Sequence, residues 1–110
     1  MRLALVIPNY NHQDAIAQTL AQLAQLELSC YLIDDGSNGE TQQLLSQLEQ
    51  QYSWVTLIRH PYNRGKGAAV MTGLRQAYQD GYTHALQIDA DGQHNLADIP
   101  AMITAAQNHP

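Results

Sequence analysis

Two aspartates, Asp89 and Asp91, follow a short apolar run and are separated by one residue. Side chains two positions apart at a strand end point the same way, so these carboxylates would repel unless a cation neutralised them. Oxygen ligands suit Mg²⁺ or Mn²⁺, and such ions commonly share their remaining positions with water and a substrate diphosphate. The spacing indicates a divalent-metal site that Gln93 and His94 could support. The alternative is a plain Asp-Gly turn at Asp91.

A second acidic pair, Asp34 and Asp35, also ends an apolar run. One carboxylate at a strand end can accept hydrogen bonds from a base or a ribose. The neighbouring Ser37 or Asn38 could cap a following helix, and Glu40 suits the first turn of that helix. Two interpretations therefore stay open. Either one of the two aspartates binds a ligand, or both are turn and capping residues.

Two of the five basic residues, Arg64 and Lys66, lie in the glycine-rich segment 63–69. Glycines and small residues at a helix start let backbone N–H groups approach an anion. The segment matches neither G-x-x-x-x-G-K-[ST] nor G-x-G-x-x-G. It is consistent with a phosphate cradle and equally with tight helix–strand packing. Tyr10, two residues after Pro8, could stack on a base or pack against a helix.

These chemical segments follow four short apolar runs, at 3–8, 30–33, 54–58 and 85–88, which are typical of buried strands. Four helical patterns alternate with them. The apolar residues that mark these helices are Ile16, Leu20, Leu23, Ala24, Leu44, Leu45, Leu48, Ala69, Leu74, Ala77, Tyr78, Ile99, Met102, Ile103 and Ala106. Asp98 and Pro100 suit the start of the last one.

This alternation predicts an α/β fold, a Rossmann-like and mostly parallel sheet of about four strands with helices on both faces. Right-handed crossovers place all four strand C-termini on one edge. Ligands bind at that edge in open α/β sheets. The polar segments all follow strands at this edge, and the connections at the opposite edge are plainer.

Composition excludes several classes of protein. The chain has 110 residues, which is enough for one domain, and its 45% hydrophobic content is that of a globular protein. A net charge of -5 with five scattered basic residues argues against duplex nucleic-acid binding. The single cysteine, Cys30, can form neither an internal disulfide nor a cysteine metal site, and it favours a reducing compartment. The run 3–8 is too short for a signal-peptide core or a membrane span.

Taken in order, four motifs resemble those of family 2 glycosyltransferases, which are inverting enzymes of the GT-A fold. The motifs are Ile7-Pro8-Asn9-Tyr10-Asn11, Ile33-Asp34-Asp35-Gly36-Ser37, Asn63-Arg64-Gly65-Lys66-Gly67-Ala68 and Ile88-Asp89-Ala90-Asp91-Gly92-Gln93-His94. The last is most similar to the branch of dolichyl- and polyprenyl-phosphate sugar transferases. The agreement runs from about Leu5 to Ile103.

The resemblance implies transfer of a sugar from a UDP- or GDP-linked donor, with inversion, to an acceptor. Mg²⁺ or Mn²⁺ would neutralise the diphosphate leaving group. The residues implied in donor binding are Pro8, Tyr10, Asn11, Asp34, Asp35, Arg64, Lys66 and Asp89, and those implied in metal binding are Asp89, Asp91 and Gln93. The last motif also suggests a lipid-phosphate or envelope-glycan acceptor.

Two residues depart from the family pattern: Gly39 stands where many members carry Asp, and His12 stands where Glu is common. Members of the family continue past the fourth motif with an acceptor site and an acidic general base. No candidate base follows Asp98, so no catalytic residue is assigned within this chain and the general base is expected beyond Pro110.

Residues 1–110 are therefore predicted to be the donor-binding part of a GT-A domain, truncated before the acceptor region and inactive alone. An uncovered sheet edge would then favour dimers. The expected location is cytoplasmic, at the membrane face in a longer protein.

Two other interpretations stay open. A non-catalytic nucleotide-binding module could use the same fold, since fold alone does not determine function. A haloacid-dehalogenase-type phosphatase also places D-x-D-G after a strand and uses the first aspartate as its nucleophile. Its motif usually continues with Thr and lies near the start of the chain, and phosphorylation of Asp89 would identify it.

Overall fold

The computed structural model describes residues 2–90 of the chain. The elements in this range are β1 Leu3–Asn9, α1 Ile16–Leu23, η1 Ala24–Leu26, β2 Ser29–Asp35, α2 Gly39–Gln51, β3 Val55–His60, α3 Lys66–Gln79 and β4 His84–Gln87. No helix within this range is both long and apolar enough to cross a membrane. The predicted last helix, marked by Ile99, lies outside the described residues.

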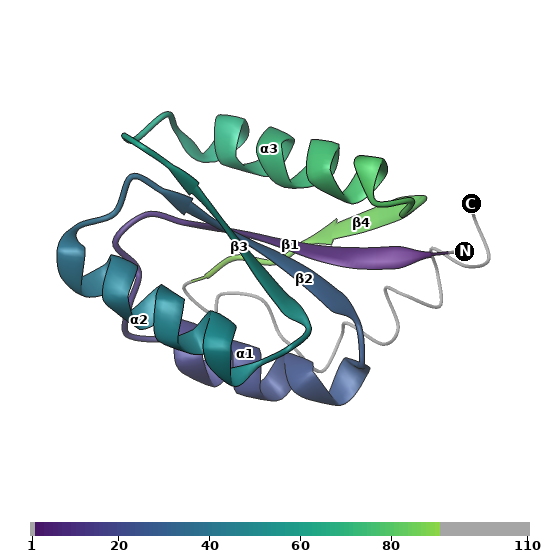
Figure 1. The fold of residues 1–110 in the computed structure, drawn as a ribbon, viewed down its shortest axis with the longest axis horizontal. Coiled ribbons are helices and arrows are strands. Elements are labelled where there is room, and N and C mark those ends of the chain that lie inside the picture. Colours follow the sequence, from purple (N-terminus) through teal and green to yellow (C-terminus); the bar gives the residue numbers. More distant parts are fainter. Residues whose placement is uncertain (1, 91–110) are drawn as a thin grey trace.

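The four strands form one parallel sheet in the order β3-β2-β1-β4. Helix α3 covers one face of the sheet, and α1 and α2 cover the other (Figure 1). This confirms the predicted α/β class, the parallel sheet and the helices on both faces. Because all strands run in the same direction, their carboxyl ends meet at one edge.

Side chains of the central strands alternate between two cores, as the two-residue period of a strand requires. The face covered by α1 and α2 buries Leu5, Ile7 and Leu32 together with Ile16, Leu20 and Leu45. The face covered by α3 buries Ala4, Val6, Tyr31, Ile33, Ala69 and Ala77. Burial on both faces explains why β1 is a continuous apolar run, and each fully buried Leu or Ile stabilises the fold by about 1.5–3 kcal/mol.

Helix α3 packs on the sheet through small residues. Its buried positions are Ala69, Gly73 and Ala77, and a Cβ atom at Gly73 would lie 2.5 Å from Cγ1 of Val6. This close approach leaves no room for large side chains at the contact. Leu74 and Tyr78, which marked the helix in the sequence, are therefore exposed, at 36% and 81%.

Each strand differs from its predicted run by one or two residues at an end, and β3 shows the reason most clearly. Strand β3 begins at Val55 and continues through Arg59 and His60, two residues past the predicted end at Ile58. The register places Arg59 beside Asp34 and His60 beside Asp35. Side-chain pairs across the two strands thus stabilise an extension that hydrophobicity alone does not predict.

The outer edge of β3 is covered by polar groups of α2. The backbone N–H of Leu57 donates to Oε2 of Glu49 at 2.6 Å, and Nη2 of Arg59 donates to Oγ of Ser46 at 2.6 Å. The outward N–H of Leu57 is therefore already paired within the chain. The dimer predicted at an uncovered sheet edge stays a prediction.

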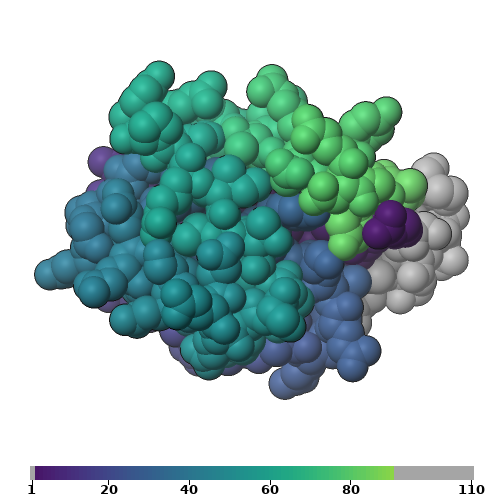
Figure 2. Space-filling view, viewed as in Figure 1, coloured from purple at the N-terminus to yellow at the C-terminus, as the bar shows by residue number. Residues whose placement is uncertain are grey.

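At the edge formed by the amino ends of the strands, the start of the chain contacts the segment between α3 and β4. Nη1 of Arg2 donates to the carbonyl oxygen of Gly81 at 3.1 Å, and the Arg2 guanidinium lies 4.7 Å from the centre of the Tyr82 ring. In Figure 2 the start of the chain, in dark purple, lies against the green segment that follows α3. These contacts tie β1 to the α3–β4 connection at the edge opposite the polar motifs.

Candidate functional site

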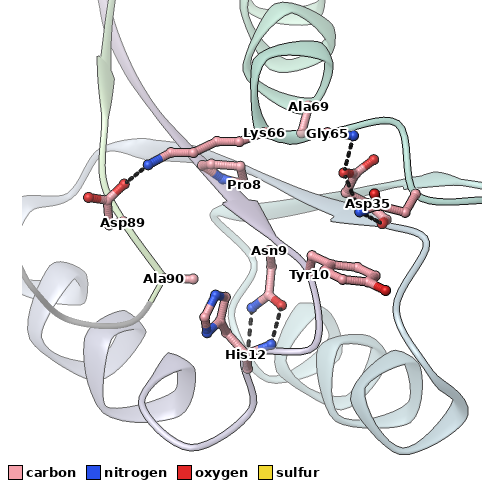
Figure 3. A pocket seen from close by; sticks show the side chains of 11 residues that line it. Pro8, Asn9, Tyr10, His12, Asp35, Gly65, Lys66, Ala69, Asp89 and Ala90 are labelled. Atoms are coloured by element: carbon pink, nitrogen blue, oxygen red, sulfur yellow. Dashed lines mark hydrogen bonds and ion pairs between the residues drawn. The ribbon is translucent and has the colours of Figure 1, made fainter.

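A pocket of about 290 Å³ lies at the carboxyl edge of the sheet (Figure 3). The end of β2 and the segments after the other three strands contribute to its wall. The lining residues are Pro8, Asn9, Tyr10, His12, Asp35, Asn63, Gly65, Lys66, Ala69, Asp89 and Ala90. The pocket thus lies where an open α/β sheet binds its ligands and where the sequence placed its polar motifs.

The loop after β1 is shaped by the buried side chain of Asn9. Its Nδ2 donates to the carbonyl oxygen of His12 at 2.8 Å, and its Oδ1 accepts the N–H of His12 at 3.1 Å. Asn11 completes the turn with a φ of 57°, a conformation that asparagine tolerates better than most residues. The turn leaves Tyr10 47% exposed on the pocket wall.

Asn11 joins this loop to the one after β2. Its backbone N–H donates to Oγ of Ser37 at 2.9 Å, and its Oδ1 accepts the N–H of Asn38 at 2.7 Å. Asn38 also caps α2, because its Oδ1 accepts the N–H of Thr41 at 3.0 Å. The predicted capping function of this segment is confirmed.

The adjacent Asp34 and Asp35 face opposite sides of the sheet because neighbouring strand residues alternate. Asp34 is buried on the α2 side, where Oδ1 accepts the N–H of Ser37 at 3.0 Å and Oδ2 pairs with Nε of Arg59 at 3.2 Å. Asp35 is buried on the α3 side and lines the pocket. Only the second aspartate of the pair is therefore part of the pocket.

The carboxylate of Asp35 holds the loop that precedes α3. Oδ1 accepts from Nδ1 of His60 at 2.7 Å and from the N–H of Arg64 at 3.0 Å. Oδ2 accepts from Nδ2 of Asn63 at 3.0 Å and from the N–H of Gly65 at 2.8 Å. Burial alone would raise the pKa of Asp35, but the bonds from His60, Arg64 and Gly65 outweigh burial and lower it. The group is therefore an ionised acceptor at neutral pH.

Gly36 lets the loops after β2 and β3 touch. Its φ is +75°, and a Cβ atom there would lie 2.3 Å from the backbone N of Asn63. Only glycine satisfies both the positive φ and this close approach. The contact adds backbone packing to the hydrogen bonds that Asp35 makes to the same loop.

Lys66 and Asp89 face each other in the pocket (Figure 3). Nζ of Lys66 donates to Oδ1 of Asp89 at 2.9 Å, with the two side chains 62% and 24% exposed. At this exposure the pair contributes at most about 1 kcal/mol, so a ligand can separate it at little cost. Lys66 is also the first residue of α3, where the first N–H groups have no partner within the helix and the helix dipole favours an anion.

The structure brings part of the predicted site together. Five of the residues implied in donor binding line the pocket: Pro8, Tyr10, Asp35, Lys66 and Asp89. Asn11 and Asp34 make the loop contacts described above, and Arg64 contributes its N–H to Asp35 while its side chain is exposed. Asp91, Gln93 and His94 lie outside the described residues. The roles of all these residues in binding stay predictions.

Several pocket residues were not among those assigned to donor or metal binding from the sequence, although His12 and the segment 63–69 were named there. Asn9, His12 and Asn63 line the pocket because of loop hydrogen bonds, and Gly65, Ala69 and Ala90 leave space for it. The asparagine at the end of the first apolar run was the available signal, since asparagine favours turns and tolerates positive φ.

Of the three residues predicted to bind a metal ion, only Asp89 lies within the described residues 2–90. Within residues 2–90, no three His, Cys, Asp or Glu side chains form a group that could hold a metal ion. Asp89 offers a carboxylate oxygen at the pocket, as Mg²⁺ and Mn²⁺ prefer. Its predicted partners, Asp91 and Gln93, lie beyond the described part of the chain.

The general base predicted from the family resemblance is not part of the described structure. The sequence assigned no catalytic residue within the chain and placed the base beyond Pro110. Pro110 itself lies outside residues 2–90, as does Asp98, the last acidic residue of the chain. The position of the base therefore stays a prediction.

The fold is that of a GT-A transferase. A mannosyltransferase from Pyrobaculum calidifontis, solved in complex with GDP-Man and Mn²⁺, superposes with a TM-score of 0.75 at 23% identity, covering 91% of this chain and 30% of that one. The sequence model of glycosyl transferase family 2 matches residues 4–110, and the chain belongs to this family. The predicted family is confirmed, and the family assignment decides against the phosphatase interpretation.

The curated relatives support the predicted branch. The UDP-N-acetylglucosamine–dolichyl-phosphate N-acetylglucosaminyltransferase of Methanococcus voltae is 33% identical, over 90% of this chain and 45% of the relative. The undecaprenyl-phosphate mannosyltransferase of Micrococcus luteus is 28% identical, over 97% of this chain and 45% of the relative. The dolichol-phosphate mannosyltransferase of Pyrococcus furiosus is 29% identical, over 98% and 31%. The chain thus spans less than half the length of these relatives.

Proposed function

We propose that this chain binds the nucleotide-diphosphate-sugar donor of a family 2 glycosyltransferase that inverts the transferred sugar. The observation that carries the proposal is the convergence of Tyr10, Lys66 and Asp89 on one pocket at the carboxyl edge of the sheet. An aromatic ring, a cation at a helix N-terminus and a carboxylate match the base, the diphosphate and the metal-bound side of such a donor.

Each part of the pocket has its own task in this proposal. Tyr10 and Pro8 offer a largely apolar surface for the base, which is uracil in a UDP-linked donor and guanine in a GDP-linked one. Lys66 and the first N–H groups of α3 bind the diphosphate, since a cation and a helix N-terminus both attract anions. Asn11 and Arg64 act on the donor from the surrounding loops, and Asp34 acts only indirectly, by holding the loop after β2 through the N–H of Ser37.

A divalent ion, Mg²⁺ or Mn²⁺, completes the proposed site. Asp89 is its described ligand, with Asp91 and Gln93 as further ligands from the motif. When bound, such an ion neutralises charge on the diphosphate as it leaves the sugar. The Mn²⁺ in the Pyrobaculum mannosyltransferase supports a divalent ion of this kind.

The acceptor in this proposal is a polyprenyl phosphate. The Methanococcus and Micrococcus relatives carry dolichyl phosphate and undecaprenyl phosphate in their names. We assign residues 1–110 to the donor-binding part, with the acceptor site and general base supplied by further chain beyond Pro110, as the relatives' greater length allows. Transfer would then take place at the cytoplasmic face of a membrane.

Calorimetric titration of the chain with UDP and GDP, in Mg²⁺, Mn²⁺ or EDTA, tests donor binding. We expect one nucleotide to bind in a metal-dependent manner. Replacing Lys66 with Gln should weaken binding about 10- to 100-fold, because a charge-assisted hydrogen bond to phosphate is lost.

Arg75→Gln is the matched control, because Arg75 is an exposed cation on the same helix and lies outside the pocket lining. It should leave the affinity unchanged. Folded protein that binds neither nucleotide, or an equal loss in the two variants, would contradict the proposed site.

A further inference from the structure

His60 is a buried histidine that touches the candidate site without lining it. It ends β3, and its Nδ1 lies 2.7 Å from Oδ1 of Asp35. On the other side of the ring, Nε2 lies 2.8 Å from Oγ1 of Thr72 in the second turn of α3. One imidazole thus connects the end of β2 to the helix that begins at the pocket.

The hydrogen-bond partners determine which ring nitrogen donates to Asp35. The Asp35 carboxylate already accepts the N–H groups of Arg64 and Gly65 and is purely an acceptor, so Nδ1 of His60 must carry the proton. Thr72 has one hydroxyl proton, which goes either to Nε2 or to the carbonyl oxygen of Ala68 at 3.0 Å. The bond from His60 to Asp35 is the same in both arrangements.

This bond orients the carboxylate that holds the pocket wall. His60 engages Oδ1, and Oδ2 then faces Nδ2 of Asn63 at 3.0 Å and the N–H of Gly65 at 2.8 Å. Asn63, Gly65 and Lys66 all line the pocket. A carboxylate free to rotate about its Cβ–Cγ bond would hold this loop less firmly.

We propose that His60 is a positioning residue for donor binding, acting through Asp35 on the loop 63–65 and so on the start of α3 that presents Lys66. The inference rests on the proposed function, because the donor diphosphate is what Lys66 is presented to. His60 touches no ligand in this account. Its effect is to keep the pocket wall in the binding geometry before the donor arrives.

Two substitutions at His60 separate positioning from a general contribution to stability. The amide nitrogen of asparagine can take the place of Nδ1 and keep the bond to Asp35. The longer glutamine places its amide near Nε2 and keeps the contact with Thr72. His60→Asn should therefore retain the affinity for the nucleotide with Mg²⁺. His60→Gln should weaken it at least about tenfold, the loss expected for one hydrogen bond to a charged group.

Hydrogen exchange gives a readout that needs no ligand. The amides of Arg64 and Gly65, which donate to Asp35, should exchange faster in His60→Gln than in the parent chain. In His60→Asn they should exchange at the same rate as in the parent chain. Thr72→Val is a third variant, since it removes the partner of Nε2 and leaves the bond to Asp35. Thr72→Val should bind the nucleotide as tightly as the parent chain does, even if its melting temperature is lowered as much as that of His60→Gln.

The outcomes distinguish the inference from the function on which it rests. A parent chain that binds neither UDP nor GDP would contradict the proposed function. In that case the exchange rates of the Arg64 and Gly65 amides would still test whether His60 positions the loop. Affinities or exchange rates that follow melting temperature across all three variants would overturn the role of His60. Loss of affinity in Thr72→Val would do the same, even if His60→Gln failed to fold.

Discussion

At the scale of single residues, the carboxylate of Asp35 connects more of the candidate site than any other group described above. It accepts hydrogen bonds from the end of β3 and from the loop that opens α3. All of these bonds go to protein groups, so the main effect of the carboxylate on the pocket is to hold its wall. Its neighbour Asp34 has a separate structural task on the other face of the sheet.

The lowered pKa of Asp35 has a consequence for acid stability. A carboxyl group whose folded pKa lies below its unfolded value, about 3.9, stabilises the fold above that pH. This contribution is lost as the pH falls through the folded pKa. We therefore expect the free energy of unfolding, measured in urea, to decrease as the pH is lowered below about 4.

Asp35→Asn should lose this pH dependence and should be less stable at pH 7 by about 2–4 kcal/mol, because the hydrogen-bond donors lose their charged partner. Asp14→Asn is the control, since Asp14 is exposed and its replacement removes the same charge. If the two variants had equal stability at pH 7, the structural role of Asp35 would be wrong.

At the scale of elements, the packing of α3 on β1 requires glycine at position 73. A Cβ atom there would lie 2.5 Å from Cγ1 of Val6 and 3.4 Å from Cδ1 of Ile33. Alanine favours a helix over glycine by about 1 kcal/mol, but overpacking a core costs about 1–3 kcal/mol. The difference between the two is a net loss, and we expect Gly73→Ala to lower the free energy of unfolding by up to about 2 kcal/mol in urea titrations.

Two further variants check the cause. Gly67→Ala lies on the same helix with nothing within 4 Å of the added Cβ, so it should be neutral or stabilising. Val6→Ala should relieve the cost of Gly73→Ala in the double variant, giving a favourable coupling between the two sites. Additive effects of Gly73→Ala and Val6→Ala would show that the clash is not the source of the loss.

The elements were largely predictable, and the loops were not. Apolar runs in β1 and β2 predicted the buried strands because both faces of the sheet are covered. The buried face of α3 differed from expectation because small residues, not large ones, contact the sheet. The distinction between Asp34 and Asp35 depends on which side chain faces which helix, and the sequence alone left that choice open. His60 belongs to a strand extension that cross-strand pairing stabilises, and hydrophobicity carries no signal for such pairing.

At the scale of the whole molecule, the two edges of the sheet have different tasks. The amino edge is stabilised by contacts such as the hydroxyl of Tyr31 donating to Asp80 and that of Tyr82 donating to Oγ of Ser29 at 2.6 Å. The carboxyl edge carries the pocket, whose lining residues come from all four strand ends. A parallel sheet produces this separation because every strand enters at one edge and leaves at the other.

The most direct test of donor binding at the carboxyl edge is a nitrogen-15 NMR titration of the chain with UDP and with GDP in Mg²⁺. We predict that one nucleotide shifts the amide signals of Tyr10, Gly65 and Lys66, which line the pocket. The amides of Gly81 and Thr83, at the opposite edge, should stay in place. Shifts confined to the opposite edge, or no shifts in folded protein at saturating nucleotide, would contradict a donor site in this pocket.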